Sequence, residues 1–153
     1  MVRAIGVVWF AAGAGGVGCA GDAEEAEPEP VETYACVHVA DGDLVDVSHD
    51  RAASESIAVG REPYRMILVP DEAGYVAFST AGPADLVLQL DFAAAVKAVW
   101  NGDERVALEP GEPNPNCDSD IVEVDYLSVP AGDHALEVGP AFQATVWAML
   151  SEP

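Results

Sequence analysis

The residues that could carry chemistry in this sequence are three cysteines, three histidines and a large excess of carboxylates. Cys36 and His38 lie two positions apart, which on a strand places both side chains on one face. Together with Cys117 and one further histidine, His49 or His134, they could ligate a soft metal such as zinc or copper. The spacings match no compact zinc motif, and a disulfide would remove both thiolates. The alternative is a set of surface or rim histidines beside a disulfide.

Acidic residues gather in two segments that could bind calcium through oxygen ligands. Asp41, Asp43 and Asp46 lie in one turn region, and Asp118 and Asp120 lie in another. Calcium needs six to eight oxygens that converge on one point, and the sequence has no EF-hand spacing. Since the chain contains 27 Asp and Glu residues, close pairs arise by chance, and solvated acidic loops are the simpler interpretation.

The sequence contains no motif typical of a catalytic centre. Gly-x-Ser-x-Gly, His-Glu-x-x-His and glycine-rich phosphate-binding patterns do not occur. Ser48, His49 and Asp50 are contiguous, but neighbouring residues on a strand point to opposite faces and cannot form a triad. We therefore expect a protein without enzymatic activity and without a cofactor.

Residues 1–18 have the features of a secretory signal peptide. Arg3 is the only charged residue before Asp22, and an apolar run from Ala4 to Ala12 follows it. The run is shorter than the ~20 apolar residues that a transmembrane helix needs. Small residues then lead to Cys19. This order predicts export from the cytoplasm.

The end of this segment, Gly16-Val17-Gly18-Cys19, resembles the lipobox of bacterial lipoproteins, with glycine at position 16 where a larger aliphatic residue is usual. The resemblance implies that Cys19 is lipidated and becomes the first mature residue. Because Ala20 rather than Asp follows the cysteine, it also implies the outer membrane. The alternatives are a plain signal peptide cut near Ala20, which would discard Cys19 and leave a secreted protein, and an uncleaved anchor.

If Cys19 carries lipid, Cys36 and Cys117 remain as an even pair in an oxidising compartment, which predicts a disulfide. The bond would close a loop of about 80 residues and stabilise the fold by ~4 kcal/mol in the chain-entropy model. Two buried free thiols, or two metal ligands, are the alternatives.

Residues 19–32 are an acidic segment that contains Pro28 and Pro30 and has no aromatic residue. Low hydrophobicity and like-charge repulsion predict an extended tether that holds residues 33–153 away from the membrane. The chain of 153 residues has a net charge of −21. Such a charge repels phosphate backbones, so we exclude nucleic acid as a partner.

Residues 33–153 show the alternation of apolar and polar residues that is typical of half-buried strands. The pattern predicts strands at 34–39, 44–47, 64–69, 74–80, 85–90, 121–129, 134–138 and 143–150. Asn101-Gly102 predicts a hairpin between 92–100 and 105–108, and the prolines of 109–116 predict a loop. About eight strands without a convincing helix indicate an all-β antiparallel sandwich of jelly-roll type.

Three segments, Pro63–Leu68, Asp85–Leu90 and Val129–Val138, resemble the bacterial pre-peptidase C-terminal domains, which are small jelly-roll sandwiches appended to secreted enzymes. The four aromatic residues Trp100, Trp147, Tyr75 and Phe78 could form a carbohydrate platform. Each lies within an apolar strand, so we expect them in the core.

These observations predict a lipid-anchored cell-envelope β-sandwich protein with a non-catalytic binding or structural role. Its partners would be the outer membrane, through the lipid, and an envelope protein or a small ligand. The alternative function is a periplasmic protein that binds zinc, copper or calcium through His38, His49, His134, Asp41 and Asp43.

Overall fold

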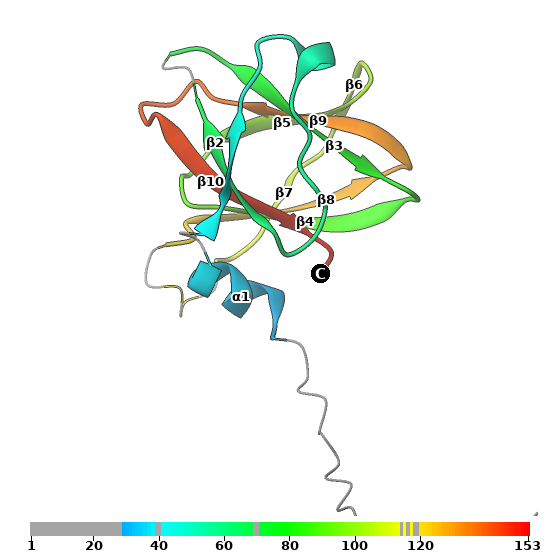
Figure 1. Cartoon of the computed structure of the whole chain (residues 1–153). Coiled ribbons are helices and arrows are strands. Elements are labelled where there is room, and N and C mark those ends of the chain that lie inside the picture. The colour runs from blue at the N-terminus through cyan, green and yellow to red at the C-terminus, as the bar shows by residue number, and fades with distance from the viewer. Residues whose placement is uncertain (1–28, 39–40, 69–70, 114, 116, 118–119) are drawn as a thin grey trace, which may run out of the picture.

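The computed structural model describes residues 29–38, 41–68, 71–113, 115, 117 and 120–153, to which the following account is limited. These residues form two sheets packed face to face, which confirms the predicted all-β sandwich (Figure 1). Sheet A contains, in spatial order, β1 (Asp43–Asp46), β2 (Pro63–Ile67), β10 (Thr145–Ser151), β4 (Ala84–Leu90), β8 (Glu123–Val129) and β7 (Glu109–Pro110). Sheet B contains β3 (Gly74–Thr80), β9 (Gly132–Val138), β5 (Val96–Asn101) and β6 (Glu104–Val106).

The strand order is that of a jelly roll. Without the short edge strands β1 and β7, sheet A reads β2-β10-β4-β8 and sheet B reads β3-β9-β5-β6. The first of these eight strands therefore pairs with the last, and the second pairs with the one before the last. All pairs among the eight are antiparallel, whereas β1 adds to the edge of β2 in parallel. This arrangement is the predicted one.

The main core lies between the sheets. Leu86, Leu88 and Leu90 of β4 face inward, as their alternation predicts, and all three are almost completely buried. Val146, Ala148 and Leu150 supply the inward face of the neighbouring strand β10. Strands β4 and β10 also carry buried residues on the side that faces away from sheet B. Sheet A must therefore be covered on both faces.

The predicted hairpin is confirmed, with strands that differ slightly from the predicted bounds. Asn101 pairs with Glu104, which leaves Gly102 and Asp103 as a two-residue turn. Gly102 has φ = +58°, a conformation that glycine adopts without steric cost. In the predicted loop 109–116, by contrast, the structure contains the two-residue strand β7 beside β8.

The first predicted strand, 34–39, is wrong. Its described residues belong to α1 (Val31–His38), and η2 (Arg51–Ala53) adds a second short helical segment. Helix α1 follows Pro30, whose carbonyl accepts hydrogen bonds from the backbone N–H of Thr33 and Tyr34. The alternation failed here because the segment packs on the outer face of a complete sheet instead of pairing with a strand. No described helix has the length and apolarity needed to span a membrane.

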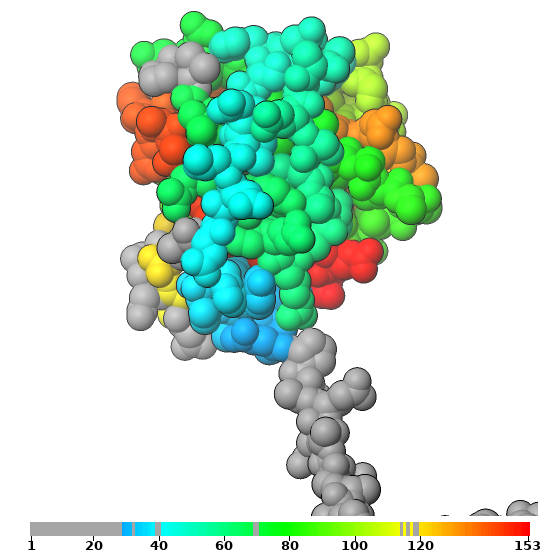
Figure 2. All heavy atoms as spheres, in the orientation of Figure 1, coloured from blue at the N-terminus to red at the C-terminus, as the bar shows by residue number. Residues whose placement is uncertain are grey.

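A second, smaller core lies between α1 and the outer face of sheet A. Ala35 of α1 is fully buried there against residues of β4, β8 and β10, including Trp147 and Met149. Figure 1 shows α1 outside the layer that contains β4 and β10. Figure 2 shows the segment after α1, in cyan and teal, running over the front of the molecule to the opposite end. That segment carries η2 to the outer side of sheet B, where it packs beside β3.

Candidate functional site

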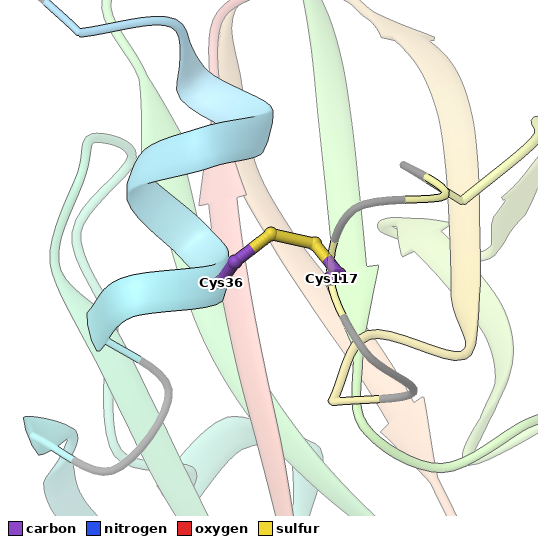
Figure 3. Close-up of a disulfide and its surroundings, with 2 residues drawn as sticks. All are labelled: Cys36 and Cys117. Atoms are coloured by element: carbon purple, nitrogen blue, oxygen red, sulfur yellow. A yellow bond between two sulfur atoms is a disulfide. The ribbon is translucent and has the colours of Figure 1, made fainter.

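Cys36 and Cys117 form the predicted disulfide, with their Cα atoms 5.1 Å apart. Figure 3 shows that the bond joins α1 to the loop before β8. Cys117 is buried in the small core beneath α1, and Cys36 packs against the same cluster. Both sulfur atoms are therefore committed to a structural link, and neither is a thiolate that could ligate a metal.

The histidines occupy three different surroundings. The His38 Nδ1 atom lies 3.1 Å from Asp41 Oδ2, and its ring stacks on Tyr34. The exposed His49 lies with Nε2 3.4 Å from Glu72 Oε2. Cys36 and His38 both belong to α1. Residues two apart on a helix do not share a face, so their side chains point in different directions and not to one side as on the predicted strand.

The acidic candidates do not converge on one point in the described part of the chain. Asp41, Asp43, Asp46 and Asp120 are exposed, while Asp118 lies outside the described residues, as does Cys19. Within the described ranges, no three His, Cys, Asp or Glu side chains are placed so that they could hold a metal ion.

The four aromatic residues divide into two pairs. Phe78 lies in the main core and Trp147 beneath α1, so core packing is confirmed for these two. It is wrong for Trp100 and Tyr75, which are only partly buried. Val99 and Val76 face the core, so the residues beside them on each strand turn outward. Trp100 and Tyr75 are two of these residues, and Trp100 lies on the outer face of sheet B.

A groove lies beside the Trp100 ring on this outer face. Trp100 is paired with Ala135 across β5 and β9, and Ala135 is paired with Ala77 across β9 and β3. Because two neighbouring positions carry only methyl groups, the surface is hollowed next to the large ring. The hollow has a volume of about 390 Å³ and is lined by Arg51, Ala52, Ser54, Ala77, Trp100, Gly102, Asp133, His134 and Ala135. We call it the Trp100 groove.

Specific contacts hold the Trp100 ring and the Arg51 side chain in place. The Trp100 Nε1–H group donates a hydrogen bond of 2.8 Å to Glu137 Oε2, one strand away. The Arg51 guanidinium lies over the ring, with Cζ 5.6 Å from the ring centroid. Its Nη2 also donates to Asp103 Oδ1 at 3.0 Å. The guanidinium is thus held between an aromatic face and a carboxylate.

The backbone under Arg51 is fixed by local capping. Asp50 Oδ1 accepts a 2.9 Å hydrogen bond from the Ala52 backbone N–H, as an N-cap residue does. Ser54 Oγ donates to the Arg51 carbonyl at 2.9 Å. The Ala77 backbone N–H donates to the Glu55 carbonyl, which ties the segment to β3. The groove is therefore bordered by anchored backbone.

His134 lies at the back of the groove but belongs to the core. Its ring is tilted against Phe78 with centroids 4.9 Å apart. Its Nε2 lies 3.0 Å from the Pro130 carbonyl oxygen; since a carbonyl can only accept, Nε2 carries the proton. The buried Nδ1 has no hydrogen-bond partner among the described residues. His134 therefore supports the groove from behind.

A pair of acids lies elsewhere, on β8. Asp125 is on the same side of the strand as the core residues Leu127 and Val129 and is almost fully buried. Burial, and to a smaller extent a hydrogen bond to Glu123 and the charge of Glu123, together raise the pKa of its carboxyl to about 6. Glu123 itself accepts a hydrogen bond from the Ala94 backbone N–H.

A second surface hollow of about 310 Å³ lies between β4, β8 and the chain end, lined by Asp85, Leu86, Ala107, Glu109, Tyr126, Leu127, Ser128 and Pro153. Its serine Oγ already donates to Asp85 Oδ1. The Trp100 groove is the stronger candidate, because it combines a fixed aromatic face with charged groups that meet at one place.

Sequence reasoning missed Arg51, Asp103, Asp133 and Glu137 as parts of this site. Arg51 and Asp103 are 52 positions apart, and Trp100 and Glu137 are 37 apart. No local pattern connects them. The pairing of β5 with β9 brings Glu137 to Trp100, and the packing of the η2 segment beside β3 brings Arg51 to Asp103.

No protein-family model matches the chain, and no curated protein matches it. What the groove does must therefore be inferred from its own geometry.

Proposed function

We propose that this chain is a lipid-anchored protein of the cell envelope with a non-catalytic binding role, and that the Trp100 groove is its binding site. The observation that carries the proposal is the partly exposed Trp100 ring, which Glu137 holds beside a floor of two alanines. A pre-oriented aromatic face offers a large contact area and loses little rotamer entropy on binding.

The placement of α1 indicates how an anchored domain would be oriented. Val31 and Glu32, the last two residues of the predicted tether, belong to α1 instead, and α1 packs on the outer face of sheet A. The Trp100 groove lies on the outer face of sheet B. A tether that leaves the domain beside α1 would therefore present the groove on the side away from the membrane.

The chemistry of the groove supports binding without catalysis. Its hydroxyl group, Ser54 Oγ, donates to a backbone carbonyl, and its imidazole, His134, packs against Phe78 in the core. Catalysis by a nucleophile requires a hydroxyl or thiol within reach of a base. Ser54 and His134 do not form such a pair, so we assign no reaction to the site.

Replacing Trp100 by leucine should reduce retention of envelope components several-fold, since the aromatic contact area is lost while the charge is kept. The measurement is cross-linking of the purified exported protein to solubilised envelope, followed by mass spectrometry. Tyr126→Leu is the matched control, because Tyr126 is an exposed aromatic residue on sheet A, away from the groove. Equal retention by all three proteins would show that the Trp100 groove is not the binding site.

Substituting Cys19 by alanine should abolish lipid labelling and release the protein from membranes, because the acceptor thiol of the lipobox-like segment is removed. Metabolic labelling with a radioactive fatty acid and membrane fractionation provide the measurement. Cys36→Ala serves as the control, since it removes a different cysteine and should leave labelling intact. Identical labelling and fractionation of the Cys19→Ala and parent proteins would refute lipidation at this residue.

A further inference from the structure

We infer that the Trp100 groove recognises the guanidinium group of an arginine on a partner polypeptide, and that Arg51 occupies this position in the free protein. The inference rests on the proposed function, because it takes the Trp100 groove as the binding site. It adds the chemical class of the ligand, and it adds that Arg51 fills the groove when no ligand is bound.

The groove already holds a guanidinium. The Arg51 Cζ lies 5.6 Å from the Trp100 ring centroid, within the ~6 Å range of a cation–π contact. The Asp103 carboxylate accepts from the same group at 3.0 Å. Tryptophan is the best aromatic partner for a cation, and a carboxylate matches the planar donors of guanidinium. Both recognition elements for an arginine are therefore present and correctly spaced.

The charged groups around the Trp100 ring favour a cationic ligand. Asp133 lines the groove, Asp103 lies at its rim, and Glu137 is bonded to the ring nitrogen. Arg105 is paired with Trp100 from β6 but donates to the Lys97 carbonyl at 2.6 Å. Without the Arg51 side chain, three carboxylates would surround the ring. The net charge of −21 further raises the local concentration of cationic partners.

The Arg51 side chain can leave the groove without disturbing the fold. The Asp103 side chain is fully exposed, and ion pairs at exposed positions are weak. The capping bonds of η2 use the Asp50 side chain, the Ala52 backbone N–H and the Arg51 carbonyl. None of these contacts involves the guanidinium. A competing arginine therefore needs to displace only one side chain.

The test is a titration of the exported, lipid-free Cys19→Ala protein with an acetylated Gly-Arg-Gly amide, followed by ¹H–¹⁵N NMR. Once the signal peptide is removed, the remaining tryptophans are Trp100 and the buried Trp147, so two indole signals report on the groove and on the core separately. We expect the Trp100 signal to shift and the Trp147 signal to stay. The citrulline peptide, which has the same shape without the charge, should not bind.

Two variants make the proposal falsifiable. Arg51→Ala should bind the arginine peptide roughly three- to tenfold more tightly, because the internal competitor is gone. Trp100→Leu, followed through the backbone signals of Gly102 and Ala135, should bind at least roughly tenfold more weakly at unchanged net charge. The Trp147 indole signal confirms that each variant is folded.

Weaker or unchanged binding by Arg51→Ala would overturn the inference, since Arg51 would then contribute to the site or play no part. Equal binding by Trp100→Leu would overturn it as well and identify non-specific attraction to an acidic surface. If envelope components need Trp100 but the arginine peptide does not bind, the proposed binding site stands and the arginine inference fails.

Discussion

Replacing Cys36 and Cys117 together by alanine should lower the midpoint of thermal unfolding by about 10 °C or more. The disulfide joins positions 81 residues apart. In the chain-entropy model, a loop of this length contributes ~4 kcal/mol by restricting the unfolded chain. Folded domains are usually stable by only ~5–15 kcal/mol, so this loss is a large fraction of the total.

The loss should be concentrated in α1. The helix has eight residues, and isolated helices shorter than ~12 residues are marginal in water. Its retention depends on the burial of Ala35 against sheet A and on the covalent link. Without the link, we expect α1 to detach before the sandwich unfolds, so its amide protons should exchange faster than those of β4 and β10.

Circular dichroism melts of the purified, oxidised protein, with and without the substitutions, measure the effect. The parent protein treated with a reducing agent should reproduce the melt of the variant, which separates loss of the bond from loss of side-chain volume. A change of less than about 3 °C in both samples would mean that the packing of α1, and not the bond, carries the stability.

The strands could be predicted because each of them buries one face against the other sheet. Leu86, Leu88 and Leu90 alternate with less apolar residues in the sequence, and their inward orientation in the structure follows from that period of two. The hairpin could also be predicted from local sequence, because Gly102 of the Asn101-Gly102 pair lies in its turn, although the two turn residues are Gly102 and Asp103. Such features need no knowledge of distant residues.

The helix and the site could not be predicted for the opposite reason. Residues 34–38 alternate like a strand, but their conformation is decided by packing on sheet A and by a cysteine 81 positions away. Whether an aromatic residue is buried depends on which outer face is covered. Trp147 is buried because α1 covers sheet A, and Trp100 is partly exposed because the cover on sheet B is incomplete.

This difference predicts unequal losses of stability for removing the two tryptophans. Trp147→Ala should lower the free energy of unfolding by about 3–5 kcal/mol, because a fully buried ring is replaced by a cavity. Trp147 has only 2% of its surface exposed. Trp100→Ala should cost about 1 kcal/mol, since the ring is only partly buried and loses mainly its bond to Glu137. Urea unfolding of the three proteins provides the comparison.

Trp147→Phe is the control for ring volume against polarity. The Trp147 Nε1–H group is buried without a hydrogen-bond partner among the described residues, so phenylalanine removes an unsatisfied donor together with part of the ring. We expect it to cost less than about 1.5 kcal/mol. A loss as large as that of Trp147→Ala would show that the indole nitrogen is satisfied in solution.

The same substitution also tests how α1 and sheet A depend on each other. Trp147 and Cys117 belong to one packed cluster, so their effects should not add. In protein lacking the disulfide, α1 no longer covers the ring firmly, and part of the burial that Trp147 provides is already lost. Trp147→Ala should therefore cost at least about 1 kcal/mol less in that background than in the parent. Full additivity would mean that α1 stays docked without the bond, and that the small core beneath it is stable on its own.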